Sequence, residues 1–201
     1  MFRAAESVRT RARRIVAVRR DRQDVLPGMG RTLQEPPGFE LRDGPGGGGD
    51  LLAWQPGRYE LMTAAGTRRS ATVEGLPPAL ELRGPWQVQF PPNRGAPERV
   101  TFERLISWSD HDDPGVRYFA GTAAYRSAFQ VPAESLGKAR RLFLDLGRVE
   151  VIAQARLNGK DLGPLWKPPF RVEVTGALKP GGNLLEVKVV NLWVNQTATF
   201  K

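Results

Sequence analysis

From residue 51 onward the sequence consists of short segments in which apolar and polar residues alternate, separated by Gly, Pro and Asn-Gly. A period of two residues places alternate side chains on opposite faces of a β-strand, whereas an amphipathic helix needs a period near 3.6. Trp86, Val88 and Phe90 alternate with Gln87 and Gln89 in this way. The same pattern recurs in residues 124–131, 142–146, 149–157, 170–174 and 185–189. The alternation predicts an antiparallel β protein.

Turn residues between these segments indicate where the chain reverses. Asn158-Gly159 supplies two residues that tolerate positive φ, as a type I′ hairpin turn requires. Ala65-Gly66 lies between the alternating segments 59–63 and 70–74 and predicts a second hairpin. Short strands at this spacing are typical of an all-β fold, an antiparallel β-sandwich or jelly roll.

The absence of cysteine and the presence of a single histidine, His111, narrow the possible chemistry. A disulfide, a thiolate nucleophile and a Cys-bearing zinc site are excluded. A metal site built from several histidines is excluded within one chain, and Ser-His-Asp catalysis would depend on His111. Carboxylate catalysis and binding of a hard cation by oxygen ligands remain open.

Basic residues are concentrated at the N-terminus. The whole chain has 30 Lys and Arg against 21 Asp and Glu, a net charge of +9, and residues 1–31 are rich in arginine. A glycine-rich run at residues 44–49 follows and favours disorder. We therefore predict a disordered Arg/Gly-rich tail over residues 1–49, a β-sandwich over 50–195 and a C-terminal tail over 196–201. Such a tail would bind polyanions nonspecifically.

No apolar run in the sequence is long enough to span a bilayer or to serve as a secretory h-region. We therefore expect no membrane partner, no signal peptide and a cytoplasmic location for the chain as encoded. The sequence contains no signal that sets an oligomeric state.

An ordered set of motifs carries a resemblance to a known family. It includes Gly-Pro-Trp-Gln-Val, Leu-Phe-Leu-Asp-Leu-Gly-Arg-Val and Ala-Arg-Leu-Asn-Gly-Lys-Asp-Leu-Gly, and its members lie at residues 84–88, 125–132, 142–149, 155–163, 168–170 and 181–187. The set resembles the sugar-binding, galactose-binding-like jelly roll of glycoside hydrolase family 2. It is still more similar to the C-terminal β-sandwich of large bacterial α-L-rhamnosidases of the family 106 type, over about residues 51–193.

The resemblance implies a galactose-binding-like β-sandwich that acts as a non-catalytic carbohydrate-binding module with a saccharide ligand. In such enzymes the catalytic carboxylates lie in a barrel, so no catalytic residue is carried over to this chain. The family pattern normally continues after Asn195, whereas this chain ends differently and has no barrel. We therefore expect an isolated ancillary domain of a glycoside hydrolase. Trp86, Tyr125, Asn158 and Gly159 match the motifs and are interpreted as core and turn residues.

Two loops combine aromatic and hydrogen-bonding side chains, as saccharide sites do. The loop between Phe102 and Tyr118 is one candidate, and Trp166 followed by Lys167 on a proline-rich loop is the other. Packing of either tryptophan onto the sandwich is the alternative interpretation. The predicted carbohydrate-binding residues are Trp108, Asp110, His111, Asp112, Arg117, Trp166 and Lys167.

The first loop leaves other chemistry open. Asp110, Asp112 and Asp113 could supply the paired carboxylates of a small glycoside hydrolase. Ser107 or Ser109 with His111 could form a serine triad, but the Gly-x-Ser-x-Gly elbow is absent from the sequence. The resemblance also implies that a structural calcium could bind the same aspartates, although their spacing differs from an EF-hand. We favour a module without catalytic residues or a cofactor over these alternatives.

Overall fold

A computed structural model describes residues 1–10, 15–25, 38–43, 48–136 and 141–191. Strands account for most of the regular structure in these residues, and the strand pairs given below are antiparallel. The predicted all-β class is therefore confirmed. The chain divides into two compact units. The larger unit comprises the described residues of 1–2, 79–137 and 142–201, and the smaller unit those of 3–78 and 138–141.

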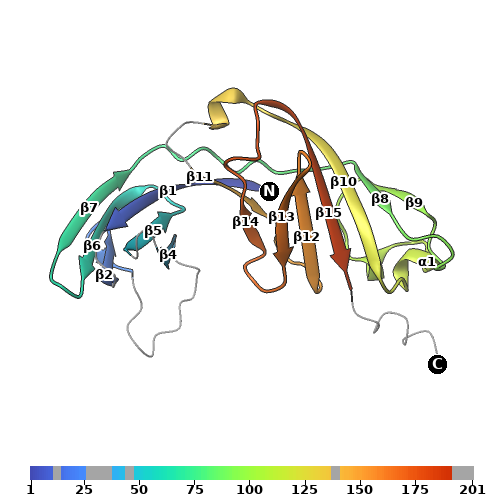
Figure 1. Ribbon diagram of the computed structural model, residues 1–201, viewed down its shortest axis with the longest axis horizontal. Helices are drawn as coiled ribbons and strands as arrows, with labels where there is room; N and C mark the ends of the chain where they lie inside the picture. The colour runs from blue at the N-terminus through green and yellow to red at the C-terminus, as the bar shows by residue number, and fades with distance from the viewer. Residues whose placement is uncertain (11–14, 26–37, 44–47, 137–140, 192–201) are drawn as a thin grey trace. The chain divides into compact units, whose positions relative to one another are not determined.

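A six-stranded antiparallel sheet forms most of the larger unit (Figure 1). Its strands lie in the order β13 (Lys160–Leu165), β12 (Ile152–Leu157), β15 (Gly181–Val190), β10 (Thr122–Val131), β8 (Trp86–Gln89) and β9 (Arg99–Phe102). Outside this sheet, β11 (Arg141–Asp145) pairs with β14 (Arg171–Glu173). The short helices are η2 (Trp108–Asp110), α1 (Pro114–Arg117) and η3 (Ala133–Leu136).

The alternation in the sequence becomes the inner and outer faces of this sheet. Ala153, Ala155 and Leu157 on β12 are fully buried, whereas Gln154 and Arg156 between them are exposed. Trp86 and Val88 on β8 are buried in the same way. The apolar inner face supplies the main hydrophobic contribution to folding, at roughly 25 cal/mol per Å² of apolar surface removed from water.

The hairpin predicted at Asn158-Gly159 joins β12 to β13, with φ angles of 52° and 82° at the two turn residues. The Asn158 side chain also connects this turn to β15. Its Nδ2 donates to the carbonyl of Ala177 at 2.8 Å and to Oδ1 of the buried Asn183 at 2.7 Å, and its Oδ1 accepts from the Leu184 N–H at 3.0 Å. Asn158 therefore combines a turn conformation with a hydrogen-bond network.

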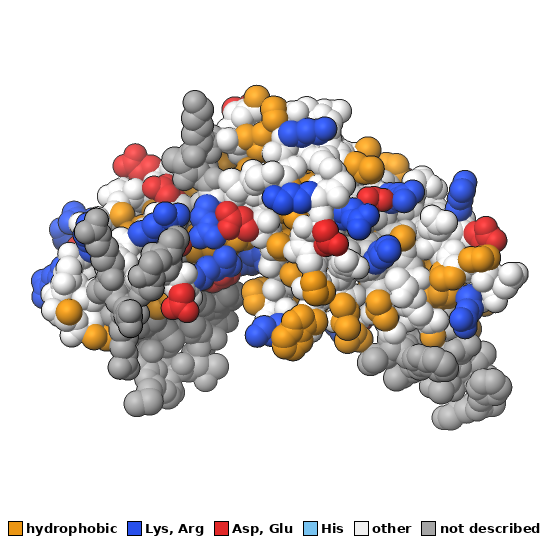
Figure 2. All heavy atoms as spheres, viewed as in Figure 1, with side chains coloured by type: hydrophobic (Ala, Val, Ile, Leu, Met, Phe, Trp, Pro, Cys, Tyr) orange, Lys and Arg blue, Asp and Glu red, His pale blue; other side chains and the backbone are white. Residues whose placement is uncertain are grey.

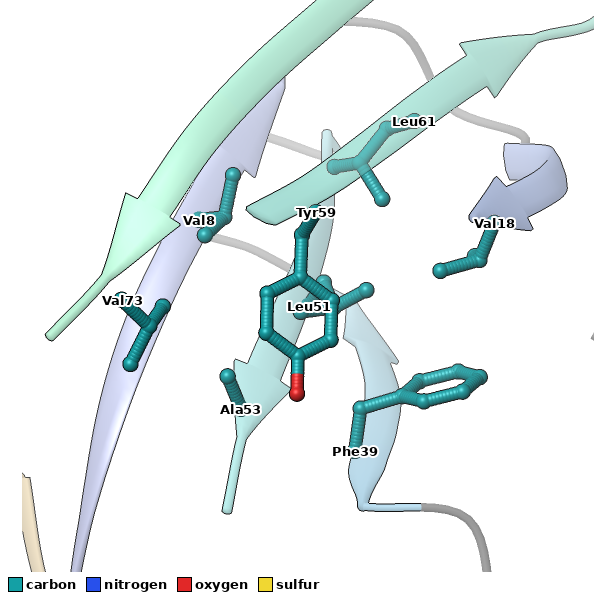
Figure 3. Close-up of a cluster of buried hydrophobic side chains, with 8 residues drawn as sticks. All are labelled: Val8, Val18, Phe39, Leu51, Ala53, Tyr59, Leu61 and Val73. Atoms are coloured by element: carbon teal, nitrogen blue, oxygen red, sulfur yellow. The ribbon is translucent and has the colours of Figure 1, made fainter. Parts of the chain in front are cut away.

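The smaller unit has a core of its own between two groups of strands. One is the four-stranded sheet β3 (Gln23–Asp24), β2 (Ile15–Arg20), β6 (Gly57–Thr63) and β7 (Arg68–Val73). In the other, β5 (Gly49–Ala53) pairs with β1 (Phe2–Thr10) and with β4 (Phe39–Asp43). Figure 3 shows side chains from both groups pointing toward one another: Val8, Val18, Phe39, Leu51, Ala53, Tyr59, Leu61 and Val73. The hairpin predicted around Ala65-Gly66 is confirmed as β6–β7.

The predicted tail over residues 1–49 is wrong for the part of it that the structure describes. Val8, Val18 and Phe39 are buried against Leu51 and Tyr59 in the core of the smaller unit. The physical reason is that a strand needs only one apolar face, so a segment rich in arginine still pairs when its arginines occupy the other face. The predicted domain boundary near residue 50 is also wrong, because the units divide after Pro78.

Several predicted features lie outside the described residues. These are residues 44–47 of the glycine-rich run, the end of the predicted sandwich near residue 195 and the C-terminal tail at 196–201. In the described part of the chain, no helix combines the length and the apolar character needed to cross a membrane.

Candidate functional site

Trp108 belongs to a buried aromatic cluster of the larger unit. The centroid of its ring lies 5.7 Å from that of Phe90 and 5.5 Å from that of Phe119, and both contacts have edge-on geometry. Its indole Nε1 donates a hydrogen bond to the hydroxyl of Tyr125 on β10. Only 6% of Trp108 is exposed. The stacking surface predicted at Trp108 is therefore wrong, because a buried indole presents no face to a sugar.

Burial also changes the ionisation of Tyr125. Removal of the hydroxyl from water raises its pKa to about 12, while the hydrogen bond from Trp108 partly offsets the increase. The hydroxyl is therefore neutral at physiological pH and available as the acceptor that the buried indole needs.

His111 and Arg117 form contacts that stabilise the same loop. The His111 ring stacks on Phe102 with centroids 5.1 Å apart, and its Nδ1 accepts a hydrogen bond from the Asp113 N–H at 3.0 Å. The Arg117 Nε donates to the His111 carbonyl at 2.9 Å. The Nδ1 of His111 and the Nε of Arg117 are thus engaged in loop structure.

The three aspartates of the loop have different surroundings. Asp113 caps α1, where its Oδ1 accepts from the Gly115 N–H at 2.7 Å and the Val116 N–H at 3.2 Å. Asp110 and Asp112 are exposed. Among the described residues, no group of three or more His, Asp or Glu side chains is arranged to hold a metal ion. Asp113 is thus engaged as a helix cap.

Trp166 has the opposite environment to Trp108. It is 64% exposed in the loop that follows β13, and the Lys167 Nζ lies 5.1 Å from the centroid of its ring. Two further apolar side chains, Ile152 and Val190, are 39% and 37% exposed and directly opposite each other on β12 and β15. Leu165 pairs with Ala153, so Trp166 follows β13 at the same end of the sheet as Ile152.

The two predicted loops do not form one site. Trp166 follows the edge strand β13, whereas Trp108 packs against Phe90, which directly follows β8. Three strands separate β13 from β8 in the sheet. At about 4.8 Å between neighbouring strands, β13 and β8 are roughly 19 Å apart. Trp166 with Lys167 is therefore the candidate for ligand contact in the larger unit.

Sequence reasoning missed a polar row on the outer face of the six-stranded sheet. Gln87 Nε2 donates to the Thr101 hydroxyl at 3.1 Å, and Arg126 pairs with Glu186 at 2.9 Å. The alternation of apolar and polar residues in the sequence indicates that each of these residues lies on the outer face of its strand. Their common row depends on the order and register of the strands, which no local pattern contains.

Comparison with known proteins agrees with this fold. No protein-family model matches the chain. A protein of Formosa agariphila described as "Putative beta-glucuronidase" is 45% identical over 141 residues, which make up 70% of this chain and 12% of that protein. The structure of a rhamnosidase from Novosphingobium sp. PP1Y matches with 35% identity and a TM-score of 0.59, covering 79% of this chain and 15% of that one.

The chain is an all-β region that is similar to part of two proteins named as glycosidases. The resemblance to glycoside hydrolases indicated by the sequence motifs is confirmed, with similarity to both a rhamnosidase and a glucuronidase-like protein. This chain spans only 12% and 15% of the lengths of those two proteins. The similarity therefore concerns a part of such enzymes and not their whole length.

Proposed function

We propose that this chain is a non-catalytic carbohydrate-binding module, an ancillary region of the glycoside hydrolase type, that binds saccharide through the Trp166 loop. The observation that carries the proposal is the 64% exposure of the Trp166 side chain at the end of β13. An exposed indole offers a broad apolar face, and the C–H face of a pyranose ring can stack on it.

Neighbouring groups suit the same ligand. The Lys167 ammonium lies beside the Trp166 ring and can donate hydrogen bonds to hydroxyl oxygens at the edge of a stacked sugar. The exposed apolar pair Ile152 and Val190 lies at the same end of the sheet. Stacking and a few directed hydrogen bonds are the two elements of a saccharide site.

The environment of the loop aspartates supports a non-catalytic role. Glycoside hydrolysis requires two carboxyl groups opposed across the scissile bond, about 5 to 10 Å apart. Asp113 instead uses its carboxylate to cap α1, and Trp108 in the same loop is a core residue. The proposed site keeps Trp166 and Lys167 from the sequence-based prediction and does not use Trp108.

The test is titration of the full chain with L-rhamnose and D-glucuronate, followed by NMR. We expect a Kd on the order of 1 mM, or about 4 kcal/mol of binding free energy. Trp166→Ala should abolish detectable binding without changing the melting temperature. Leu105→Ala is the matched control, because Leu105 is 55% exposed in a different loop. Retained binding in Trp166→Ala, or equal loss in Leu105→Ala, would refute the site.

A further inference from the structure

A groove in the smaller unit is lined by four arginines. Arg19 on β2, Arg58 on β6, and Arg68 and Arg69 on β7 line it together with only two acidic residues, Asp24 and Glu60. Figure 2 shows Lys and Arg side chains, with acidic side chains beside them, over the region of β6 and β7. The groove thus has an excess of positive charge.

The strand register places part of this lining on one face of the sheet. Met62 lies opposite both Ala17 and Arg68, which forms one row across three strands. Glu60 lies opposite Arg19 in the next row on the same face. Rows two residues apart are separated by about 7 Å along the strand. A ligand the size of a few sugar rings could therefore contact both rows.

The arginines of the groove differ in the partners they have. Arg19 Nε lies 2.7 Å from Asp24 Oδ1, and Arg58 Nε lies 3.5 Å from Glu60 Oε1. Arg68 and Arg69 form no ion pair or side-chain hydrogen bond with another described residue. Arg68 lies on the face of Met62 and Glu60, whereas Arg69 lies opposite Leu61 in the alternate row. The Arg68 guanidinium is therefore available on this face to an external anion, and Arg69 adds positive charge to the same lining.

We propose that this groove binds an acidic saccharide through its carboxylate groups. The guanidinium of arginine has a planar fork that matches a carboxylate with two parallel hydrogen bonds. The half-buried Met62 and Ala17 provide an apolar floor beside Arg68, against which the C–H face of a sugar can lie. That the groove binds an anion is inferred from the arginines alone. That the anion is a sugar carboxylate rests on the proposed function.

The two acidic residues favour a saccharide over a nucleic acid or polyphosphate. A polyphosphate carries closely spaced charges, and Asp24 and Glu60 would repel it within the groove. The hydroxyl groups of a saccharide can instead donate hydrogen bonds to these carboxylates. A ligand that carries both carboxylate and hydroxyl groups therefore suits a groove that contains both arginine and acidic side chains.

The experiment is calorimetric titration of the full chain with trigalacturonate, with its methyl ester and with a short polyphosphate. We expect trigalacturonate to bind at least about tenfold more tightly than the ester, since the ester lacks the negative charge that a guanidinium group recognises. The double variant Arg68→Gln/Arg69→Gln should weaken trigalacturonate binding about tenfold or more. The matched control is Arg94→Gln/Arg99→Gln, which removes the same charge from exposed positions of the larger unit and should leave affinity unchanged within about twofold.

Specific outcomes would overturn the inference. Equal binding of acid and ester would exclude carboxylate recognition, and equal weakening in both double variants would show only a general charge effect. Polyphosphate binding as tight as that of trigalacturonate would identify a phosphate site. Loss of trigalacturonate binding in Trp166→Ala but not in Arg68→Gln/Arg69→Gln would place the acidic sugar at Trp166. That result would refute binding in the groove and would leave the proposed carbohydrate-binding function standing. Melting curves and amide shifts of Met62 in each variant show that the sheet is intact.

Discussion

The indole nitrogen of Trp108 donates a hydrogen bond to the hydroxyl of Tyr125, and both side chains are buried. This bond joins the loop before α1 to the middle of β10, and the surrounding Phe90 and Phe119 rings exclude water from it. Trp108 therefore contributes to stability and not to ligand contact.

Replacement of Trp108 by phenylalanine should destabilise the larger unit more than the same change at Trp86. Trp108→Phe removes buried surface and also leaves the Tyr125 hydroxyl without its donor, which adds about 1 to 3 kcal/mol. Trp86 is equally buried, but no acceptor for its Nε1 is present among the described residues. Urea denaturation of the two variants measures the difference. Equal free energies of unfolding would show that the hydrogen bond contributes nothing.

Tyr125 should make the protein sensitive to alkaline pH. Its pKa in the folded state is about 12, above the ordinary value of 10.0, because burial disfavours the charged phenolate. The stabilisation is therefore complete below pH 10 and is lost as the pH rises toward 12. The difference corresponds to roughly 2 to 3 kcal/mol. Denaturation midpoints between pH 9 and 12 should fall more steeply for the original protein than for Tyr125→Phe, and parallel curves would contradict this assignment.

A buried ion pair should behave differently from an exposed one of the same length. Arg171 Nη2 lies 2.8 Å from Asp145 Oδ2 with both side chains about nine-tenths buried, whereas Arg126 and Glu186 form a more exposed pair at 2.9 Å. Arg171→Gln should cost about 3 to 5 kcal/mol, because it leaves a buried carboxylate without its cation. Arg126→Gln should cost about 0 to 1 kcal/mol.

The same pair predicts a response to acid. Burial would raise the pKa of Asp145, but hydrogen bonds from Arg171 and the Gly147 N–H and the charge of Arg171 lower it on balance below 3.8. The stabilisation is therefore present above pH 3.8 and is lost as the pH falls through the lower folded-state pKa. Acid unfolding curves from pH 5 to 2 should flatten in Arg171→Gln and keep their slope in Arg126→Gln. The reverse order would exclude Asp145 as an acid-sensitive group.

Local periodicity was sufficient to predict the strands but not the environment of every aromatic side chain. Trp86, Val88 and Leu157 were expected in the core and are buried, whereas Phe129 and Val189 on the same faces are only half-buried. Trp108 and Trp166 both occur in polar loops, so neither neighbouring sequence distinguishes them. What separates them is the packing of Phe90 and Phe119 around Trp108, which depends on contacts between distant segments.

The N-terminal strands show a second limit of the sequence argument. Charge and glycine content suggested disorder because they were averaged over a long segment. Val8, Val18 and Phe39 each lie on the one face of their strand that packs in the core. Their partners Leu51 and Tyr59 come later in the chain, so a window restricted to residues 1–49 contains only three of the eight buried side chains of this core. The arginine groove was missed for the same reason, since its lining comes from strands separated in sequence.

Truncation of the N-terminal segment should therefore destabilise the smaller unit. Deletion of residues 1–48 removes Val8, Val18 and Phe39 from the core drawn in Figure 3. It also removes both partners of β5, namely β1 and β4, and leaves β6 paired with β7 alone. Phe39→Ala alone should cost about 3 to 5 kcal/mol. Hydrogen exchange of the amides of Leu51 and Leu61 measures the effect directly. Unchanged protection of these amides in the truncated chain would show that the N-terminal strands do not stabilise β5 and β6.

Asn158 offers a way to separate a turn conformation from a hydrogen-bond network. Its φ of 52° favours glycine or asparagine, while its amide connects the β12–β13 turn to Asn183 and to the backbone of Ala177 and Leu184. Asn158→Gly keeps the backbone conformation and removes the network, whereas Asn158→Ala removes the network and adds strain of about 1 kcal/mol. Both variants should lose about 2 kcal/mol or more, because the buried Asn183 side chain loses a partner, with Asn158→Ala the less stable of the two. If Asn158→Gly were as stable as the original protein, the hydrogen-bond network would contribute nothing to stability, and Asn158 would matter only for the turn conformation.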